Sequence, residues 1–357
     1  MAEVITMFKV FSGVLGMDVG IDLGSSNVVV YVKDKGIVFS EPSAVAVKKR
    51  PRGEGSEVIA VGEAAKAMSG KVPSGIEAIW PLEGGVIANF DMTQELIKYC
   101  LKRVSSNNTF MVHPRVVISI PAEVTEVERK AVIDATLGAG ASEAYVVEEP
   151  ISAALGVGLP IDRPSGCMII DIGGGTSEVS VISLGGIVVT SSLRTAGKMM
   201  DNAIITMVRQ RYALLIGEST AEEVKNTIGS ALPLNPELEM SVKGRDLSDG
   251  LPKSDIVSSI EVREAMEPIF TGIEDMVKVA LEKMPPELAK DVVDRGIILT
   301  GGVALMRGFS ERLSRAINTP VIVAEQPLNS VALGVGKILD NLGTMKRGLM
   351  SVQHGSR

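Results

Sequence analysis

The chain has 357 residues, more than one ordinary domain, so we expect two lobes with separate hydrophobic cores. Hydrophobic residues make up 45% and charged residues 22% of the chain, a balance that excludes an intrinsically disordered protein. The net charge of −7 gives no general electrostatic attraction to nucleic acid, so no nucleic-acid partner is expected.

Cysteine and histidine are too few for several kinds of site. Cys100 and Cys167 each lie in an apolar run, and we expect both to be reduced core residues. The two histidines, His113 and His354, support neither a zinc cluster nor a catalytic triad. No run of about 18 apolar residues occurs, and the N-terminus lacks a secretory pattern. We therefore expect a cytoplasmic protein.

The first element in chain order is an amphipathic N-terminal segment, residues 1–16. Polar Glu3, Thr6, Lys9 and Ser12 lie opposite a set of apolar side chains at helical spacing. The apolar set is Val4, Met7, Phe8, Phe11, Val14 and Leu15.

Short apolar runs separated by turn residues follow, and they predict strands. The strands expected in the first half are 17–23, 28–32, 37–39, 45–47, 58–61, 115–120 and 144–147. Helices are expected at 92–104 and 125–137. The second begins with a capping box, because Glu128 lies three residues after Thr125. Pro150 predicts the first turn of a further helix.

The early pattern then returns with strands at 167–170, 178–182 and 187–190. Asp22 and Asp171 lie 149 positions apart, and each follows an apolar strand and precedes a glycine turn. This repetition indicates an internal duplication. The remaining sequence predicts helices at about 198–214, 219–230, 261–283 and 330–342, and strands near 237–243, 250–257 and 297–300.

Three glycine-containing turns are the candidate ligand-binding segments. They lie at residues 22–27, 171–177 and 299–304. Glycines allow backbone N–H groups to approach phosphate oxygens, and the hydroxyls of Ser25, Ser26 and Thr176 can add hydrogen bonds. An aspartate that ends a buried strand without a basic neighbour suits a hydrated magnesium ion. The alternative is a set of tight structural hairpins. Two duplicated Asp-x-Gly hairpins and a later Thr-Gly-Gly favour a nucleotide site.

These turns resemble those of the superfamily of actin, the heat-shock ATPases and sugar kinases, and the chain is most similar to the MreB family of bacterial cell-shape proteins. The similarity extends from about Asp18 to Asp340. It includes Gly20-Ile-Asp-Leu-Gly24, Pro81-Leu, Gly85-Val-Ile, Glu126-Val-Glu-Arg129, Glu148-Glu-Pro150, Asp171-Ile-Gly-Gly-Gly-Thr176, Ile182-Ser-Leu-Gly-Gly186, Gly244-Arg-Asp-Leu247, Asp294-Arg-Gly296 and Val331-Ala-Leu-Gly334.

The resemblance implies an α/β actin-like ATPase fold. Two duplicated lobes, each with a mixed five-stranded sheet flanked by helices, would hold ATP in a cleft between them. Lobe I would comprise 17–160 and 328–345, with a small inserted subdomain at about 48–90. Lobe II would comprise 161–327, with an insertion at about 200–260, and residues 346–357 would form a flexible tail.

The resemblance also implies residue roles. Asp22 and Asp171 would hold Mg²⁺ through water. The phosphates would be bound by Gly24, Ser25, Ser26, Asn27, Gly173, Gly174 and Gly175. The adenosine and the α-phosphate side would be contacted by Glu222, Glu223, Val224, Lys225, Gly301, Gly302, Val303 and Ala304.

Glu149, assisted by Thr176, would orient the attacking water. Alone, Glu148-Glu149-Pro150 is also an ordinary helix start, and 220–225 an ordinary solvated helix face. Two positions depart from the family pattern: Val303 replaces a usual glycine, and Lys198 replaces a usual acid.

Three functions compete on this fold. A chaperone ATPase is disfavoured because only about fifteen residues follow the last predicted helix. A sugar kinase is disfavoured by the closer motif matches. The resemblance implies a weak ATPase that polymerises into filaments, pairs its protofilaments and maintains rod shape by guiding cell-wall synthesis.

The partners implied by the resemblance are further copies of the chain, membrane-anchored elongation and cell-wall synthesis proteins, and the inner face of the cytoplasmic membrane. Residues 4–15, with Val4, Met7, Phe8 and Phe11, and a loop with Phe110 and Met111 offer apolar membrane contacts. The alternatives are a helix docked on the core and a buried hairpin.

Overall fold

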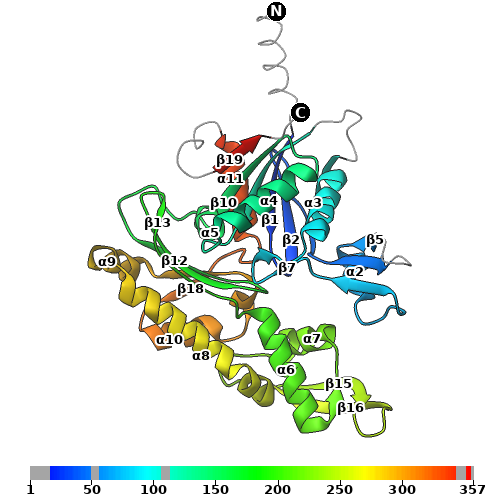
Figure 1. Cartoon of the computed structure of the whole chain (residues 1–357). Helices are drawn as coiled ribbons and strands as arrows, with labels where there is room; N and C mark the ends of the chain where they lie inside the picture. The colour runs from blue at the N-terminus through cyan, green and yellow to red at the C-terminus, as the bar shows by residue number, and fades with distance from the viewer. Residues whose placement is uncertain (1–16, 50–55, 106–112, 343–350, 355–357) are drawn as a thin grey trace, which may run out of the picture. The chain divides into compact units, whose positions relative to one another are not determined.

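The computed structural model describes residues 17–49, 56–105, 113–342 and 351–354 (Figure 1). The chain divides into two compact units. Unit 1 comprises residues 1–158 and 329–357, and unit 2 comprises residues 159–328. Each unit has a hydrophobic core of its own.

The main sheet of unit 1 has the strand order β19-β10-β9-β1-β2-β3. Its strands are β1 (Asp18–Leu23), β2 (Asn27–Val32), β3 (Gly36–Pro42), β9 (Arg115–Ile120), β10 (Glu143–Glu148) and β19 (Ser351–His354). The first three form the predicted antiparallel meander, and β9 continues the sheet parallel to β1.

The sixth strand, β19, corrects two expectations. Residues 346–357 were expected to be a flexible tail, and the sheet was expected to have five strands. Residues 351–354 instead pair antiparallel with β10. A sheet edge presents a row of unpaired N–H and C=O groups, and β19 satisfies those of β10.

The unit 1 sheet is covered by helices on both faces, because successive residues of its central strand, β1, face helices on opposite sides of the sheet. Val19 and Ile21 of β1 belong to the core that includes residues of α3 (Phe90–Ser105) and α4 (Glu126–Gly138). These two helices lie together beside β1 and β2 in Figure 1. Gly20, between them in sequence, faces α11 (Ser330–Asp340), where a Cβ would lie 2.6 Å from Val335 Cγ1.

Two predicted helix starts in unit 1 are confirmed. The Thr125 side chain caps the Glu128 N–H and the Glu128 side chain caps Thr125, which completes the capping box of α4. Pro150 lies in the first turn of α5 (Glu149–Gly156).

Helices α5 and α11 pack so closely that their contact excludes side chains. A Cβ at Gly156 would overlap with the carbonyl oxygen of Ser330, and a Cβ at Gly334 would overlap with that of Ser152. The contact therefore fixes α11, which follows unit 2 in the chain, onto unit 1.

Gly334→Ala is therefore expected to lower the free energy of unfolding by about 3 kcal/mol or more, because the helices must separate. A matched control is Gly272→Ala in α8 (Ser259–Lys283), where a Cβ would meet nothing within 4 Å. That variant should gain up to about 1 kcal/mol from helix propensity. Chemical denaturation followed by circular dichroism measures both changes, and equal stability of the two variants would contradict the packing argument.

A small sheet is inserted in unit 1, with the order β5-β4-β6 and the helix α2 (Glu63–Met68) beside it. Its strands are β4 (Val45–Lys49), β5 (Ser56–Val61) and β6 (Ile76–Ile79). The hairpin of β7 (Leu82–Glu83) and β8 (Val86–Ile87) then leads back to α3.

The main sheet of unit 2 repeats the arrangement of unit 1. Its order, β13-β12-β11-β17-β18, matches β3-β2-β1-β9-β10 strand for strand. The strands are β11 (Cys167–Ile172), β12 (Ser177–Ser183), β13 (Gly186–Leu193), β17 (Ile297–Thr300) and β18 (Val321–Val323). The predicted internal duplication is thus confirmed by the strand order.

The rest of unit 2 is mainly helical. It contains α6 (Gly197–Tyr212), α7 (Glu218–Ile228), α8, α9 (Pro286–Arg295), the 3-10 helix η2 (Gly302–Leu305) and α10 (Phe309–Ile317). A second small sheet has the order β14 (Leu214–Leu215), β15 (Glu239–Asp246) and β16 (Pro252–Ser258). Helices α9 and α10 were not predicted, although Pro285-Pro286 and Gly308 mark their starts.

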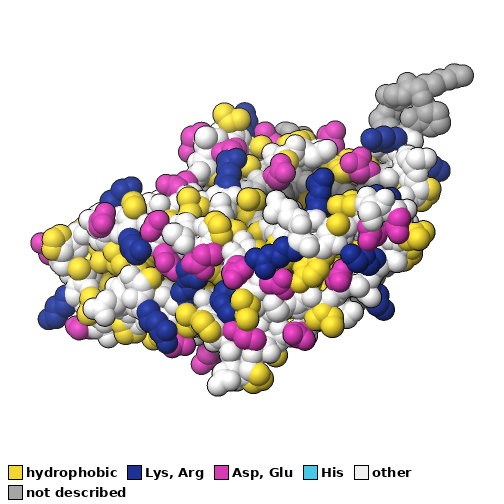
Figure 2. Space-filling view, turned by 90° about the horizontal axis from the view of Figure 1, so that it is seen from below, with side chains coloured by type: hydrophobic (Ala, Val, Ile, Leu, Met, Phe, Trp, Pro, Cys, Tyr) yellow, Lys and Arg dark blue, Asp and Glu magenta, His cyan; other side chains and the backbone are white. Residues whose placement is uncertain are grey.

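The surface mixes both signs of charge. On the face shown in Figure 2, acidic and basic side chains alternate with small apolar areas. Among the residues that the structure describes, no helix combines the length and apolar character needed to cross a bilayer.

Candidate functional site

The first glycine turn is a tight hairpin that the rest of unit 1 holds in place. A Cβ at Gly24 would lie 2.7 Å from the Asn27 carbonyl oxygen, so only glycine fits there without a shift. The Ser43 hydroxyl donates to the Gly24 carbonyl oxygen at 2.6 Å, and the Gly85 N–H donates to the Ser25 hydroxyl at 2.9 Å. Ser25 is buried, so its hydroxyl is a fixed part of the turn.

Asp22 lies at the carboxyl end of β1, where parallel strands of an α/β sheet commonly bind ligands. The Ser119 hydroxyl on the neighbouring strand β9 donates to Asp22 Oδ1 at 3.2 Å. Glu149 begins α5 directly after the next parallel strand, β10. The fold therefore places Asp22, the predicted magnesium residue, and Glu149, the predicted water-orienting residue, at the carboxyl ends of parallel strands of one sheet.

The two adjacent glutamates differ in their surroundings. Glu148 Oε1 lies 3.5 Å from the Arg129 guanidinium of α4. This ion pair directs Glu148 toward α4 and makes it the weaker candidate for orienting water. Glu149 is partly exposed at the start of its helix.

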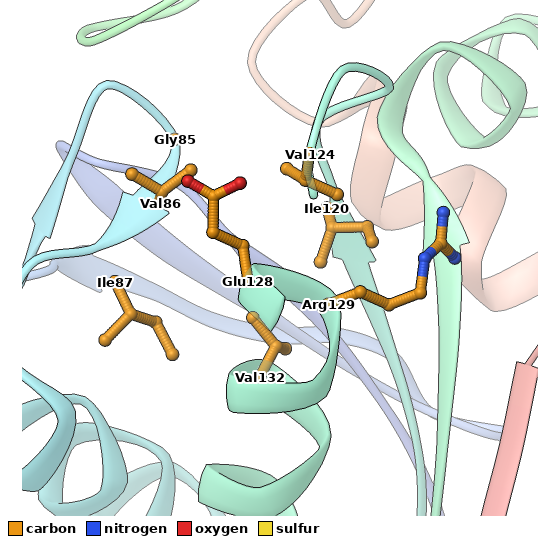
Figure 3. A pocket seen from close by; sticks show the side chains of 8 residues that line it. All are labelled: Gly85, Val86, Ile87, Ile120, Val124, Glu128, Arg129 and Val132. Carbon is orange, nitrogen blue, oxygen red and sulfur yellow. The ribbon is translucent and has the colours of Figure 1, made fainter. Parts of the chain in front are cut away.

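A small, mainly apolar cavity lies near the carboxyl end of β9, between the β7–β8 turn and the start of α4 (Figure 3). Its volume is about 10 Å³, room for about one water molecule, and its walls include Val86, Ile120 and Val132. Ligand sites for molecules of nucleotide size usually exceed about 300 Å³ and carry several polar groups. The cavity therefore does not match the predicted nucleotide site.

Asp171 and the third glycine turn lie side by side in unit 2. Asp171 is the register partner of Thr300 on the parallel strand β17. Gly301 has a φ of +84°, and a Cβ there would overlap with the Ile172 carbonyl oxygen and lie 2.5 Å from Asp171 Oδ1. The Gly301 N–H and the Thr300 hydroxyl both donate to the Pro327 carbonyl oxygen at 2.9 Å, which fixes the turn.

Asp171 as a whole residue is partly exposed, yet desolvation of its carboxylate by burial raises its pKa from 3.8 to about 6. No hydrogen bond or ion pair to this carboxylate occurs among the described residues. A cation that approached Asp171 would relieve an unfavourable desolvation.

The second glycine turn, 173–176, is joined to the start of α6. The Gly173 N–H donates to the Thr176 carbonyl oxygen at 2.9 Å, which closes the hairpin. The N–H groups of Gly197 and Lys198 donate to the carbonyl oxygens of Gly173 and Gly174, at 3.2 and 2.8 Å. The first N–H groups of α6 are thus used by the hairpin itself.

Lys225 on α7 is held next to the same hairpin. Its ammonium group donates to the Gly197 carbonyl oxygen at 3.1 Å and pairs with Asp201 Oδ1 at 2.8 Å. Burial raises the pKa of Asp201 to about 6, although Lys225 acts in the opposite direction. Both side chains are largely buried, so the pair forms part of the interior of unit 2.

The other predicted residues of α7 and η2 differ in exposure. Glu222 is partly exposed and Glu223 is exposed, whereas Val224 is fully buried in the hydrophobic core. Val224 belongs to the apolar stripe of α7, so its side chain is unavailable to a ligand. Val303 and Ala304 are also core residues, which leaves Gly301 and Gly302 as the accessible backbone of that turn.

These residues fit a magnesium nucleotide. The first hairpin contains a glycine, Gly24, where a Cβ would meet the backbone, and the second follows Asp171, whose carboxylate has no hydrogen bond or ion pair among the described residues. The structure, over the residues it describes, contains no cluster of three potential metal ligands. Each of the two hairpins is preceded by one aspartate, and Mg²⁺, which usually keeps several of its waters, needs only one or two carboxylates.

Comparison with known proteins identifies the family. The model of the MreB/Mbl protein family matches residues 16–347. The chain belongs to the MreB/Mbl family. It is 47% identical over 334 residues to the cell shape-determining protein MreB of Escherichia coli strain K12, covering 94% of this chain and 96% of that protein.

Solved structures of the MreB/Mbl family agree with the fold. The ADP-bound MreB5 of Spiroplasma citri has a TM-score of 0.87 and 37% identity, covering 94% of this chain and 99% of that chain. The AMPPNP-bound form has a TM-score of 0.85 and 36% identity, covering 92% and 97%. The expected actin-like α/β fold is therefore confirmed.

Six predicted membrane residues lie outside the described part of the chain. They are Val4, Met7, Phe8, Phe11, Phe110 and Met111.

Sequence reasoning missed three polar side chains that contact predicted site residues, namely Ser119, Asp201 and Ser43. Ser119 could have been noticed as a polar residue within a buried strand. Asp201 and Ser43 gave no local signal, because their partners lie on other elements.

Proposed function

We propose that this member of the MreB/Mbl family is an ATP-binding, ATP-hydrolysing cytoskeletal protein that polymerises into membrane-associated filaments and maintains rod cell shape. The observation that carries the proposal is the placement of Asp171 against the Gly301 turn and beside the 173–176 hairpin. Relatives of the same family that are bound to ADP and AMPPNP support this use of the site.

In this proposal the two hairpins bind phosphates through the backbone N–H groups of 24–27 and 173–175. Asp22 and Asp171 would hold Mg²⁺ through water, and Mg²⁺ would supply positive charge against the phosphates. Ser119 keeps the Asp22 carboxylate oriented. Glu149 and Thr176 orient the water that attacks the terminal phosphate. Glu222, which is partly exposed on α7, would contact the adenosine.

Nucleotide-dependent assembly tests the proposal. The purified protein is incubated with ATP, ADP or no nucleotide, then sedimented and imaged by electron microscopy. We expect filaments with ATP, because ATP favours subunit addition and hydrolysis later weakens the filament. Phosphate release that requires a sugar, without filaments, would favour a sugar kinase instead.

A matched pair of variants assigns the hydrolytic residue. Glu149→Gln should retain ATP-dependent filaments and lose about 100-fold in phosphate release, because one positioned acid–base group contributes about this much. Glu148→Gln, at the glutamate paired with Arg129, should release phosphate at nearly the wild-type rate. The opposite ranking would assign the role to Glu148.

Membrane attachment is supported by where the two apolar segments join the described fold. Residues 1–16 precede β1 and residues 106–112 precede β9. Asp18 and Arg115, the first residues of these parallel strands, are register partners. The Arg115 guanidinium donates two hydrogen bonds of 2.7 Å to the Asp18 carboxylate. Neighbouring strands lie about 5 Å apart, so both segments join the sheet at the amino-terminal ends of β1 and β9.

We therefore expect that deletion of residues 1–16 combined with Phe110→Ser abolishes co-sedimentation with liposomes, because apolar area drives the insertion. Phe90→Ser, which changes an exposed phenylalanine on α3, should leave co-sedimentation unchanged. Retention of full binding by the first variant would refute the membrane contact.

The proposed cellular partners are membrane-anchored elongation proteins and cell-wall enzymes, with the filaments at the inner face of the cytoplasmic membrane.

A further inference from the structure

A continuous set of hydrogen bonds joins α7 to the phosphate hairpin. Lys225 Nζ donates to the Gly197 carbonyl oxygen, and the Gly197 N–H donates to the Gly173 carbonyl oxygen. The following N–H, that of Lys198, donates to the Gly174 carbonyl oxygen. Gly197 is therefore bonded on one side to α7 and on the other side to the turn that is proposed to bind phosphate.

The packing at Gly197 leaves little room for movement. A Cβ there would lie 3.3 Å from the Gly173 carbonyl oxygen and 3.5 Å from Lys225 Nζ. Gly197 is also buried. Loss of the Lys225 ammonium group from this position removes the hydrogen bond to the Gly197 carbonyl oxygen, and with it one of the contacts that hold Gly197 next to the hairpin.

Asp201 holds the ammonium group in this position. It lies four residues after Gly197 on α6, and its carboxylate is 2.8 Å from Lys225 Nζ. The side chains are only 12% and 13% exposed, so loss of either partner leaves a buried charge without its counterion. The ammonium group donates a hydrogen bond to the Gly197 carbonyl oxygen and forms an ion pair with the Asp201 carboxylate.

We propose that the Asp201–Lys225 pair is a positioning device for the phosphate hairpin, so that it sets affinity for the phosphate chain of the nucleotide and not for adenosine. The inference rests on the proposed function, because it assumes that the 173–176 hairpin binds nucleotide phosphates. A lysine that contacted adenosine directly would affect all adenine nucleotides alike.

Competition binding with AMP, ADP and ATP against a fluorescent ATP analogue separates these roles. Asp201→Ala should lower the affinity for ATP about 10-fold, which is typical of a residue that acts on a site without contacting the ligand. The affinity for AMP should change less than about 2-fold, since AMP lacks the phosphates that the hairpin would hold. The ratio of AMP to ATP dissociation constants therefore falls.

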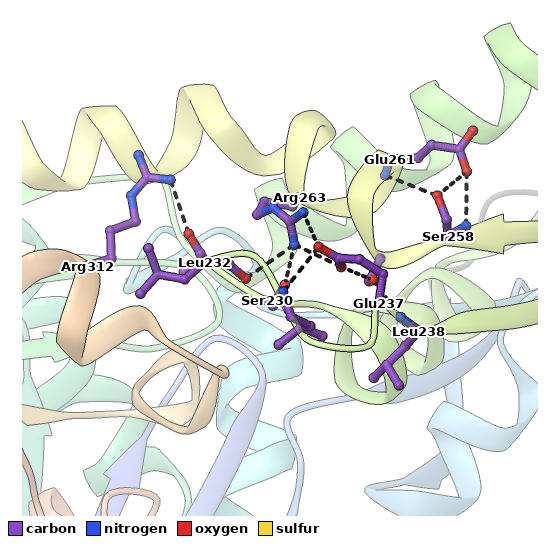
Figure 4. A network of polar contacts seen from close by, with 11 residues as sticks. Ser230, Leu232, Glu237, Leu238, Ser258, Glu261, Arg263 and Arg312 are labelled. Atoms are coloured by element: carbon purple, nitrogen blue, oxygen red, sulfur yellow. Dashed lines mark hydrogen bonds and ion pairs between the residues drawn. The ribbon is translucent and has the colours of Figure 1, made fainter.

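The matched control is Arg263→Met, which breaks another largely buried ion pair of unit 2 (Figure 4). Arg263 on α8 binds Glu237, the Ser230 hydroxyl and the Leu232 carbonyl oxygen. None of these groups contacts the hairpin in the described structure. The variant should lose stability and keep the wild-type ratio of AMP to ATP affinities.

Two results would overturn the inference. An equal loss of affinity for AMP and ATP in Asp201→Ala would place Lys225 at the adenosine. A loss of stability with an unchanged affinity ratio, as in Arg263→Met, would make the pair structural only.

Hydrogen exchange of the nucleotide-free protein separates failure of this inference from failure of the proposed function. Mass spectrometry should show faster amide exchange at 173–177 and 196–199 in Asp201→Ala and not in Arg263→Met. Unchanged exchange in Asp201→Ala would refute the proposal that the Asp201–Lys225 pair positions the hairpin, whatever the wild-type protein binds. Wild-type protein that binds no adenine nucleotide would instead refute the proposed function.

Discussion

Replacing Asp171 by asparagine is expected to stabilise the nucleotide-free protein at pH 7 while removing magnesium-dependent ATP hydrolysis. The asparagine keeps the shape of the side chain and removes a charge that the surroundings solvate poorly. Burial raises the pKa of Asp171 from 3.8 to about 6, which corresponds to about 3 kcal/mol of unfolding free energy at neutral pH.

The pH dependence fixes the direction of this effect. Because the folded-state pKa is higher than the unfolded-state pKa, the folded protein binds the proton more tightly. The wild-type protein therefore loses stability as the pH rises from about 4 to about 6, and Asp171→Asn lacks this loss. The two proteins should be equally stable at about pH 4 and differ most above about pH 6.

Urea denaturation at several pH values measures this difference. Asp162→Asn, at an exposed carboxylate of the same unit, is the control and should show a pH profile parallel to that of the wild type. An Asp171→Asn protein that is less stable than wild type at pH 7 would show that the carboxylate is stabilised by an interaction and not strained by burial. Retained magnesium-dependent phosphate release would remove Asp171 from the proposed metal site.

The second large effect is expected for Gly301→Ala. A Cβ at Gly301 would overlap with the Ile172 carbonyl oxygen and approach Asp171 Oδ1 to 2.5 Å, and its φ of +84° is unfavourable for alanine. We expect the free energy of unfolding to fall by about 3 kcal/mol. We also expect ATP affinity to fall at least about 10-fold, because β17 and the Asp171 carboxylate must move apart.

Gly302→Ala is the matched control for this change. A Cβ at Gly302 would meet only Leu328 Cδ2 at 3.6 Å, an ordinary contact, and its φ is not in the left-handed region. Its stability should therefore stay within about 0.5 kcal/mol of wild type. Thermal unfolding and ATP titration of both variants provide the measurement. Equal losses of stability and ATP affinity in Gly301→Ala and Gly302→Ala would contradict the argument that only Gly301 lies too close to its neighbours for a side chain.

The sequence by itself determined the parts that depend on local patterns. Four features arise from residues that are close together in the chain. They are the capping box at Thr125, the helix start at Pro150, the two meanders and the duplicated Asp-x-Gly turns. Their side-chain periodicity and turn chemistry act within a few residues, so each could be found without knowledge of the fold.

Only the tertiary structure decided which distant groups meet. Three contacts join elements that are remote in sequence. Ser119 donates a hydrogen bond to Asp22, Gly301 lies against Asp171, and Asp201 forms an ion pair with Lys225. The burial of Val224 and the pairing of 351–354 with β10 were decided in the same way. These outcomes depend on strand order and on which face of a helix meets the core, and a single sequence encodes them only through packing of the whole unit.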